Sequence, residues 1–348
     1  MDTGSKLGLC NRRWLPESSY NVAQYILHLL SKLRISGLKV YYFTDKGPIR
    51  AVDGINLEIP DGESLGIVGE SGCGKSTLGA ALMRSIPAGG GIVGGTIILE
   101  DADIIKMQAS EFNNKMRWKK IAMVFQGAMN ALDPVYTVES QLREILEEHK
   151  FQGNIEEKIA ESLQQVGLDV SIGKRYPHEL SGGMKQRIVI AMALLLKPDL
   201  LIADEPTTAL DMLVQSQIIS LLTKLSKENG ISVIMITHDL ALVSQIADKV
   251  GIMYAGQLVE ISSRNDIYKN PRHPYTRALI EAMPRLRTMD KKIHFVKGRP
   301  PSLLNPEAGC RFYARCTHAM DVCKRDPPEF KTETGYVRCW LYEGNPQP

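Results

Sequence analysis

Residues 69–76 read GESGCGKS, and Thr77 follows them. An apolar run at 65–68 precedes this stretch, and a helical pattern at 78–84 follows it. Glycines let such a loop curl so that successive backbone N–H groups point inward at phosphate oxygens, above the N-terminus of a helix. In this strand–loop–helix context the pattern G-x-x-x-x-G-K-S predicts a site for the phosphates of a nucleotide.

The side chains of this loop have separate expected roles. Lys75 can reach the β- and γ-phosphates, and the Ser76 hydroxyl is placed to ligate Mg²⁺. Cys73 stands at a variable position and is expected to be a small filler rather than a reactive thiol. The residues expected to contact the nucleotide are Gly69, Ser71, Gly72, Cys73, Gly74, Lys75, Ser76 and Thr77. Kinases, GTPases and transport motors share such a loop, so the loop alone does not fix the reaction.

An acidic pair further along the chain narrows the range of possible reactions. The apolar run 200–203 leads directly into Asp204 and Glu205. A carboxylate at the carboxyl end of a buried strand beside the phosphate loop suits Mg²⁺, and we assign that role to Asp204. The adjacent Glu205 points elsewhere and is predicted to polarise an attacking water as a general base. The alternative is a pair of acids that only cap a strand end.

The apolar pattern around these motifs predicts an α/β fold. Runs at 65–68, 121–125, 200–203 and 233–236 indicate buried strands of a parallel sheet with helices on its faces. Residues 38–59 alternate as two extended segments around a polar turn, and 250–260 reads as a hairpin. A short strand is expected at 96–99 after a glycine-rich breaker at 89–95. The stretch 137–196 is mostly helical in pattern.

Length and composition exclude several classes of protein. The 348 residues suggest two domains, and 44% hydrophobic with 23% charged residues is typical of a globular protein. A net charge of +3, from 42 basic and 39 acidic residues, gives no strong field toward nucleic acid or an anionic membrane. No apolar run approaches the roughly 18 residues of a membrane span. Six cysteines and no recognisable signal peptide argue against a secreted disulfide scaffold.

Residues 180–184 read LSGGM and lie between the phosphate loop and the acidic pair. They resemble the LSGGQ signature of ATP-binding-cassette (ABC) ATPases, with Met184 in place of the usual glutamine. A serine and two glycines at a helix start form a second anion-binding N-terminus. In that family each signature closes over the ATP of a second cassette. The resemblance therefore implies that Ser181, Gly182 and Gly183 contact the nucleotide of a partner.

Other positions resemble the family in the same order. Gln126 resembles the Q-loop residue that senses Mg²⁺ or water, Asp211 the D-loop residue at the dimer seam, and His238 the switch histidine on the γ-phosphate. Tyr42 stands where an aromatic ring stacks on adenine, although Tyr41 and Phe43 compete for that role. The resemblance implies an ATPase whose catalytic residues are Lys75, Gln126, Glu205 and His238 and whose Mg²⁺ ligands are Ser76, Gln126 and Asp204.

The composition changes after Pro271, and we place a domain boundary near residue 265. The stretch NPRHPYTRAL at 270–279 resembles the HPY element that follows the cassette in importers of dipeptides and oligopeptides, and 275–283 is expected to form a short helix. Four late cysteines suit sulfur ligation of Zn²⁺ or an iron–sulfur cluster, and their long spacing disfavours zinc. The importer resemblance implies a 4Fe–4S cluster on Cys310, Cys316, Cys323 and Cys339. Disulfides are the alternative expected of an oxidising compartment.

Three segments are expected. Residues 1–35 form an N-terminal extension with a short amphipathic helix on Val22, Ile26, Leu29, Leu30 and Leu33. Residues 36–265 form the ABC ATPase domain, a parallel-sheet core with an antiparallel β-subdomain and a helical subdomain at about 127–196. Residues 266–348 form a small loop-rich C-terminal extension that carries the cysteines.

The implied function is ATP hydrolysis that drives the import of di- or oligopeptides, at the cytoplasmic face of a cell membrane. An oligosaccharide importer and a non-transport ABC ATPase are the alternatives. The expected cofactors are ATP, Mg²⁺ and the 4Fe–4S cluster. The expected partners are a second cassette (a heterodimer is favoured), two permease subunits and an extracytoplasmic substrate-binding protein, with no nucleic acid.

Overall fold

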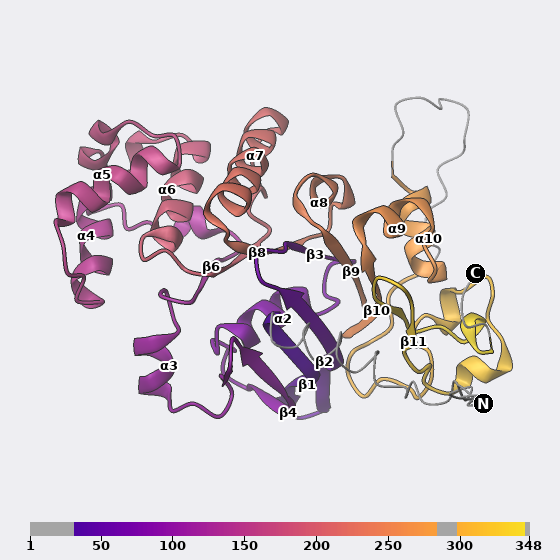
Figure 1. Cartoon of the computed structure of the whole chain (residues 1–348). Coiled ribbons are helices and arrows are strands. Elements are labelled where there is room, and N and C mark those ends of the chain that lie inside the picture. Colours follow the sequence, from indigo (N-terminus) through magenta and orange to yellow (C-terminus); the bar gives the residue numbers. More distant parts are fainter. Residues whose placement is uncertain (1–30, 284–297, 345–348) are drawn as a thin grey trace, which may run out of the picture.

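A computed structural model describes residues 31–283 and 298–344 of the chain (Figure 1). Within these ranges the strands form two sheets. The antiparallel sheet has the order β2-β1-β4-β5, and the core sheet has the order β11-β12-β10-β9-β3-β8-β7-β6. The α/β prediction, with an antiparallel subdomain beside a largely parallel core, is confirmed.

The antiparallel sheet consists of β1 (Ser31–Thr44), β2 (Gly47–Pro60), β4 (Gly90–Leu99) and β5 (Ala102–Asp103). The predicted pair of extended segments is the β1–β2 hairpin. The predicted breaker at 89–95 is wrong, because β4 already begins at Gly90. A Cβ at Gly90 would lie 2.6 Å from the Tyr42 ring, and one at Gly95 would lie 2.5 Å from Leu38 Cα. These glycines therefore allow β4 to approach β1 closely rather than end a strand.

The core sheet contains the four predicted buried strands. They are β3 (Leu65–Val68), β6 (Ile121–Val124), β7 (Leu200–Asp204) and β8 (Ser232–Thr237), and they pair in parallel. The predicted hairpin is β9 (Lys249–Tyr254) with β10 (Gln257–Ser263), and β9 runs parallel to β3. The carboxyl ends of β3, β6, β7 and β8 therefore meet at one edge, which is where ligands bind in sheets of this kind.

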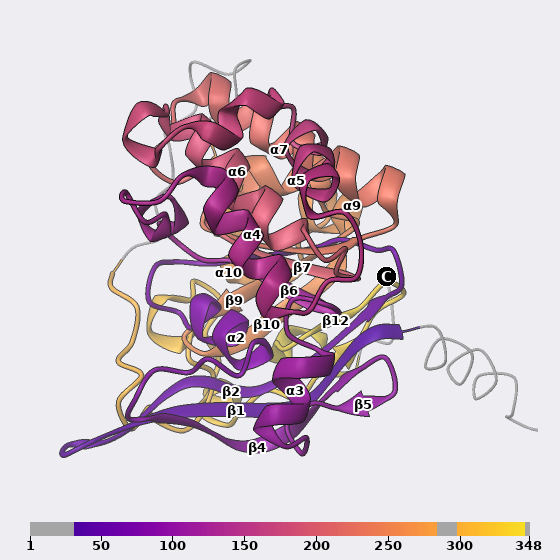
Figure 2. The same cartoon turned by 90° about the vertical axis from the view of Figure 1, so that its left-hand side faces the viewer.

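Helix α2 (Lys75–Leu82) lies between the two sheets, as Figure 2 shows from the side. One hydrophobic cluster joins the antiparallel sheet, this helix and the core sheet through residues such as Leu33, Leu78 and Ile236. Helices α7 (Met212–Asn229) and α8 (Leu240–Ile246) cover the other face of the core sheet (Figure 1).

The predicted helical stretch forms a separate layer. It contains α4 (Val138–Glu148), α5 (Ile155–Gln165) and α6 (Gly182–Leu194), with the short 3₁₀ turns η1 (Ala128–Ala131), η2 (Val170–Lys174) and η3 (Pro177–Glu179). Helix α3 (Ala109–Lys115) precedes β6. No helix among the described residues is both long enough and apolar enough to cross a membrane.

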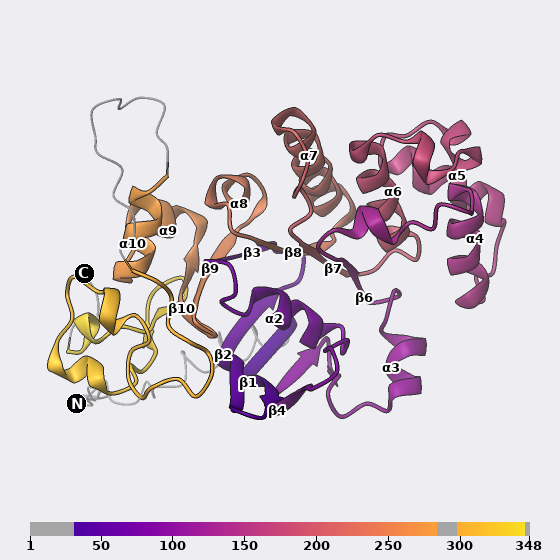
Figure 3. The same cartoon turned by 180° about the vertical axis from the view of Figure 1, so that it is seen from behind.

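The C-terminal region packs onto the core rather than forming a core of its own. Helices α9 (Arg264–Lys269) and α10 (Pro274–Glu281) follow β10, so the predicted short helix is confirmed. The tail contains η4 (Tyr313–Arg315), η5 (Asp321–Lys324), β11 (Phe330–Lys331), β12 (Tyr336–Val337) and η6 (Trp340–Tyr342). Strand β12 pairs with β10, and Figure 3 shows the tail beside β10 and β2. A third hydrophobic cluster draws residues from both sides of position 265.

The start of the fold differs from the expectation. Most of the expected amphipathic helix, with Val22, Ile26, Leu29 and Leu30, lies outside the described residues. Leu33 is fully buried in β1, which begins at Ser31, so the fold starts before the boundary expected at residue 36. The spacing of Leu33 fits both a helical repeat and the alternation of a strand, and pairing with β2 and β4 decides between them.

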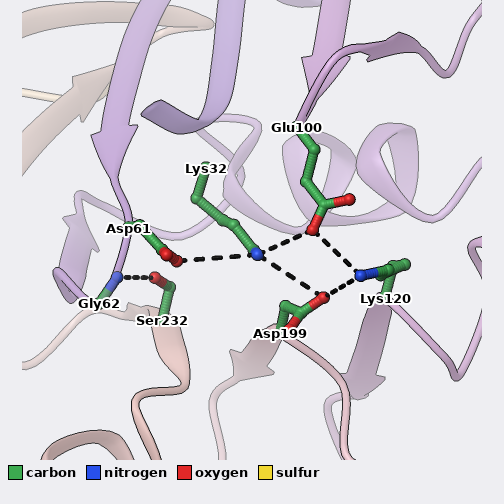
Figure 4. A network of polar contacts seen from close by, with 7 residues as sticks. All are labelled: Lys32, Asp61, Gly62, Glu100, Lys120, Asp199 and Ser232. Atoms are coloured by element: carbon green, nitrogen blue, oxygen red, sulfur yellow. Dashed lines mark hydrogen bonds and ion pairs between the residues drawn. The ribbon is translucent and has the colours of Figure 1, made fainter. Parts of the chain in front are cut away.

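A network of charges joins the two sheets at the amino ends of β6 and β7 (Figure 4). Lys32 Nζ lies 2.9 Å from Glu100 Oε1, 3.6 Å from Asp199 Oδ2 and 3.7 Å from Asp61 Oδ1. Lys120 Nζ bridges the first two of these carboxylates at 3.2 and 2.9 Å. Burial alone would lower the pKa of Lys32, but the carboxylates outweigh burial and raise it. The network thus stabilises the charged form of this lysine.

Candidate active site

The phosphate loop has the strand–loop–helix context that the sequence predicts. It runs from the end of β3 to Lys75, the first residue of α2. A Cβ at Gly69 would lie 2.1 Å from Met253 O, and one at Gly74 would lie 1.9 Å from Ala51 O. Gly74 also has a φ of +102°, which side-chain-bearing residues rarely adopt. The loop therefore requires glycine at both positions.

The Lys75 side chain is buried inside the loop. Its Nζ donates to Gly69 O at 2.7 Å and to Glu70 O at 3.1 Å. An incoming phosphate would exchange these carbonyl oxygens for phosphate oxygens, which carry more negative charge. Burial raises the pKa of the neighbouring Cys73 thiol, which agrees with its expected role as an inert filler.

Asp204 ends β7 with its side chain turned inward. The residue is 2% exposed, and its Oδ1 has no hydrogen-bond partner within the described part of the chain. Burial raises the pKa of this carboxyl, although a hydrogen bond with Ser76 opposes the rise. A buried carboxylate oxygen without a partner, next to a serine hydroxyl, is the donor chemistry that a hard cation such as Mg²⁺ requires. The residues predicted to hold Mg²⁺ at this point fit that ion.

The structure brings Glu205 and His238 together. His238 Nδ1 lies 3.0 Å from Glu205 Oε1, and Thr208 Oγ1 donates to Glu205 Oε2 at 2.7 Å. The His238 side chain is 61% exposed, so the pair faces solvent on one side. Burial alone would raise the pKa of Glu205, but the hydrogen bonds of His238 and Thr208 outweigh it and hold this pKa below its ordinary value.

Thr208 is a residue of the site that sequence reasoning missed. It lies three positions after Glu205 in the loop that leaves β7, and only the folded loop returns its hydroxyl to the carboxylate. Gln126 lies just beyond β6 at the same sheet edge, with its side chain exposed. The sheet therefore brings the loop, Gln126, the acidic pair and His238 to one edge.

The signature residues begin α6, as predicted. Ser181 caps the helix, and its Oγ accepts the Met184 N–H at 3.3 Å. Ser181 and Gly182 are exposed, while a Cβ at Gly183 would lie 2.7 Å from Val214 Cγ1. This helix belongs to the layer of α4 and α5, whereas the phosphate loop leads into α2 between the sheets (Figure 1). A Cβ at Gly182 would make only an ordinary contact, 3.4 Å from Leu210 Cδ2, whereas Gly183 is packed tightly against α7.

Asp211 has a local structural task. Its Oδ1 accepts the Val214 N–H at 3.0 Å and so caps α7. The next two residues, Met212 and Leu213, are 86% and 71% exposed. The expected D-loop position is therefore at the surface, beside two apolar side chains.

The three aromatic residues of β1 have different surroundings. Tyr42 is half-buried, with its hydroxyl 3.4 Å from Thr77 Oγ1 in the first turn of α2. Tyr41 donates to Asp53 Oδ1 at 2.6 Å. Phe43 is 61% exposed. Tyr42 thus lies next to the phosphate-loop helix, as its predicted role in adenine stacking requires, while Tyr41 is tied to β2.

The four late cysteines lie close enough to influence one another. Burial raises the pKa of Cys310 to about 11 and that of Cys339 to about 12, and the charges of the other thiols contribute in the same direction. Backbone N–H groups donate to three of the sulfurs, for example His318 N to Cys316 Sγ at 3.4 Å. A Cβ at Gly309 would lie 2.8 Å from Cys323 O, so this glycine lets two cysteine-bearing segments meet.

The expected metal cluster is not confirmed. In residues 31–283 and 298–344 every cysteine is a free thiol, and no group of three or more His, Cys, Asp or Glu side chains has an arrangement that holds a metal ion. The donor set, four sulfurs with N–H groups directed at three of them, fits sulfur-bound iron or zinc in its chemistry.

Comparisons with known proteins agree with the site. Residues 52–208 match the ABC transporter family, and residues 259–323 match the family described as "Oligopeptide/dipeptide transporter, C-terminal region". The dipeptide transport ATP-binding protein DppD of Caldanaerobacter subterraneus subsp. tengcongensis is 43% identical, over 89% of this chain and 97% of that protein. The oligopeptide transport ATP-binding protein OppD of Escherichia coli is 44% identical, over 88% of this chain and 91% of that protein.

A solved structure agrees as well. The ATP-binding cassette MJ0796, solved as a dimer in a post-hydrolysis state with ADP and Pi, matches with a TM-score of 0.60 and 26% identity. The match covers 67% of this chain and 98% of that one. With the phosphate loop, the acidic pair and the signature all in place, this chain belongs to the ABC transporter ATPases, in the group that carries the oligopeptide/dipeptide-type C-terminal region.

Proposed function

We propose that this chain binds ATP with Mg²⁺ and hydrolyses it to drive the uptake of di- or oligopeptides. The observation that carries the proposal is the meeting of Lys75, Asp204, Glu205 and His238 at one edge of the core sheet. The relatives named for dipeptide and oligopeptide transport support peptides over oligosaccharides as cargo, and they support a transport role over a non-transport ATPase.

Binding begins at the phosphate loop. Lys75 leaves the loop carbonyls and neutralises the β- and γ-phosphates, while the N–H groups of 69–77 bind phosphate oxygens. Tyr42 stacks on the adenine. Ser76 and Asp204 hold Mg²⁺, with Gln126 completing its environment. When bound, the ion neutralises the charge on the phosphate oxygens.

Hydrolysis uses the pair at the end of β7. The Glu205 carboxylate accepts a proton from a water molecule whose oxygen attacks the γ-phosphorus, and the bond to ADP breaks. Thr208 and His238 fix the orientation of this carboxylate, and His238 also contacts the γ-phosphate. The low pKa of Glu205 keeps it ionised at neutral pH, ready to receive the proton.

A second cassette completes the site. The exposed Ser181 and Gly182, together with Gly183 and Asp211, form a surface that contacts the nucleotide of that partner. The two ATP-binding chains form a heterodimer in this proposal. Closing on ATP and reopening after hydrolysis moves the two chains, and this motion drives two permease subunits. A substrate-binding protein outside the membrane delivers the peptide, and this chain lies peripherally on the cytoplasmic face.

The function is tested by Glu205→Gln in the complete transporter, reconstituted in vesicles with its permeases and binding protein. We expect the variant to bind ATP normally but to hydrolyse it roughly 10²- to 10⁴-fold more slowly, the usual contribution of a general base. Peptide uptake should fall with it. Glu228→Gln, an exposed change on α7, is the matched control. Normal turnover in Glu205→Gln, or uptake of oligosaccharides but not peptides, would contradict the proposal.

We also propose that Cys310, Cys316, Cys323 and Cys339 hold a 4Fe–4S cluster that orders the tail, with Zn²⁺ as the alternative. The mutual influence of the thiols and the N–H groups directed at sulfur support this. Protein purified without oxygen should be brown, absorb near roughly 400 nm and contain iron with acid-labile sulfide. The Cys323→Ser variant should lose the absorbance near roughly 400 nm and the bound iron and sulfide. Stoichiometric zinc without iron would decide for the alternative.

A further inference from the structure

Two side chains of the C-terminal region contact one residue of the phosphate loop, Glu70. The hydroxyl of Tyr275, on α10, accepts the Glu70 backbone N–H at 3.1 Å. The two terminal nitrogens of Arg315, in the cysteine-bearing tail, donate to the two carboxylate oxygens of Glu70 at 2.8 and 2.9 Å. A guanidinium that meets a carboxylate through two parallel bonds fixes its orientation as well as its position.

Glu70 is in turn bonded to the part of the loop that receives phosphate. Its carbonyl oxygen accepts Lys75 Nζ at 3.1 Å and the Cys73 N–H at 3.3 Å. The N–H, the carbonyl and the carboxylate of Glu70 are thus all engaged at once. A continuous path of hydrogen bonds therefore runs from Arg315 through Glu70 to Lys75.

The contact is enclosed rather than a surface ion pair. The Arg315 side chain is 6% exposed and its guanidinium lies 5.6 Å from the centre of the Tyr254 ring. The rings of Tyr254, Tyr275 and Phe312 pack with centres 4.6 to 5.4 Å apart, joining β9, α10 and the tail. Because these neighbours restrict both side chains, the groups that hold Glu70 are rigid.

The His-Pro-Tyr stretch places Tyr275 in this position. His273 Nδ1 accepts the Tyr275 N–H at 3.1 Å and caps α10, with Pro274 in its first turn. The buried Glu260 of β10 accepts the N–H groups of Arg272 and His273 at 2.8 and 2.9 Å. The start of α10 is therefore fixed to the core sheet, and its tyrosine is directed at the loop.

We propose that Tyr275 and Arg315 are positioning residues for ATP binding, which hold Glu70 so that the phosphate loop is already in its binding conformation. The inference rests on the proposed function, since it takes the loop to bind ATP. It makes the C-terminal region a part of the nucleotide site. Loss of either contact removes pre-organisation and weakens ATP binding.

The test measures ATP affinity and stoichiometry by calorimetry on the purified full-length chain. We expect Arg315→Gln and Tyr275→Phe to raise the ATP dissociation constant about tenfold, within the usual range for coupled sites. In the assembled transporter, KM for ATP should rise more than kcat falls. Arg315→Lys should recover part of the affinity. The double variant Glu70→Gln, Arg315→Gln should bind ATP no more weakly than either single variant does, because each change removes the same ion pair.

Matched controls remove the same groups elsewhere in the region. Arg325→Gln loses a guanidinium that stacks on Trp340, and Tyr342→Phe loses a hydroxyl that donates to Arg272 O. Both should bind ATP as the unchanged chain does. Unaltered affinity in Arg315→Gln, or a lower number of sites with unaltered affinity, would overturn the positioning role. If the unchanged chain shows no Lys75-dependent ATP binding, it is the proposed function that fails.

Discussion

Glu205 has a left-handed backbone conformation that is rare for residues other than glycine, with a φ of +46°, and its N–H donates to Ile236 O at 2.8 Å. That turn aims the carboxylate at Thr208 and His238 rather than alongside Asp204. Two neighbouring acids thereby acquire opposite pKa shifts, raised for Asp204 and lowered for Glu205. Such a division is typical of sites where one acid binds a cation and the other handles a proton.

Thr208→Val tests the environment of Glu205. Its hydroxyl helps to lower the pKa of Glu205, so activity that needs the ionised carboxylate disappears as the pH falls through that pKa. Removing the hydroxyl raises the pKa, and the acid limb of the kcat–pH profile should move to higher pH. Thr223→Val, which removes a hydroxyl bonded within α7, is the control. An unmoved acid limb would contradict the assignment.

Asp204→Asn separates metal binding from folding. The buried Asp204 carboxylate, whose Oδ1 has no hydrogen-bond partner within the described residues, opposes folding when no cation is present, so the amide should stabilise the Mg²⁺-free chain by roughly 1 kcal/mol. The same change should raise the Mg²⁺ concentration needed for half-maximal hydrolysis. Thermal unfolding in a chelator and a Mg²⁺ titration measure the two effects. A lower unfolding temperature of the variant in the chelator would show that the contacts of the carboxylate, including the one with Ser76, outweigh the cost of burying it.

At the scale of elements, the sequence pattern predicted the strands that are buried on both faces. Continuous apolar runs marked β3, β6, β7 and β8, because strands covered on both faces have no polar side to show. The glycines of β4 led to a wrong prediction, because they allow close contact with β1 rather than form a turn. The start of β1 was missed because Leu33 fits a helical period as well as a strand, and only strand pairing resolves the choice.

The two signature glycines should respond differently to a methyl group. Gly183→Ala places a Cβ 2.7 Å from Val214 Cγ1, and the branched valine has little freedom to move, so we expect a loss of roughly 1–3 kcal/mol of stability. In Gly182→Ala the nearest atom would be 3.4 Å away, an ordinary contact. Chemical unfolding of the two variants measures the difference. Equal stabilities would mean that α6 and α7 shift apart easily.

At the scale of the molecule, the change in composition predicted a separate C-terminal region but gave no indication of how that region attaches to the core. Local composition carries no information on which distant strand a segment joins. In the structure β12 adds to β10, Leu304 bridges to Ile49, and Arg311 pairs with Asp53. The site was predicted more fully than this attachment, because its motifs have fixed spacing, whereas Thr208, Tyr275 and Arg315 act through contacts that only folding creates.

Truncation tests this attachment. A chain that ends at residue 283 loses β12 and so leaves the edge of β10 open to association. It also loses Phe312, whose burial is worth roughly 2–3 kcal/mol. We expect the truncated chain to unfold at a lower temperature and to aggregate in light scattering. The full-length Lys324→Ala variant, altered at an exposed position of the same tail, should behave normally. A truncated chain that stays monomeric and equally stable would show that the tail is dispensable.

The charge network around Lys32 has a consequence for handling the protein. Its contacts of 2.9 to 3.7 Å lie well inside the screening length of about 8 Å at physiological ionic strength, so they persist there. In molar salt that length shrinks to about 3 Å, comparable to the contacts themselves. Molar salt therefore weakens these ion pairs between the two sheets, at the amino ends of β6 and β7, because carboxylates such as Asp61 are exposed to the added ions. The Arg315–Glu70 contact is more enclosed and is screened less.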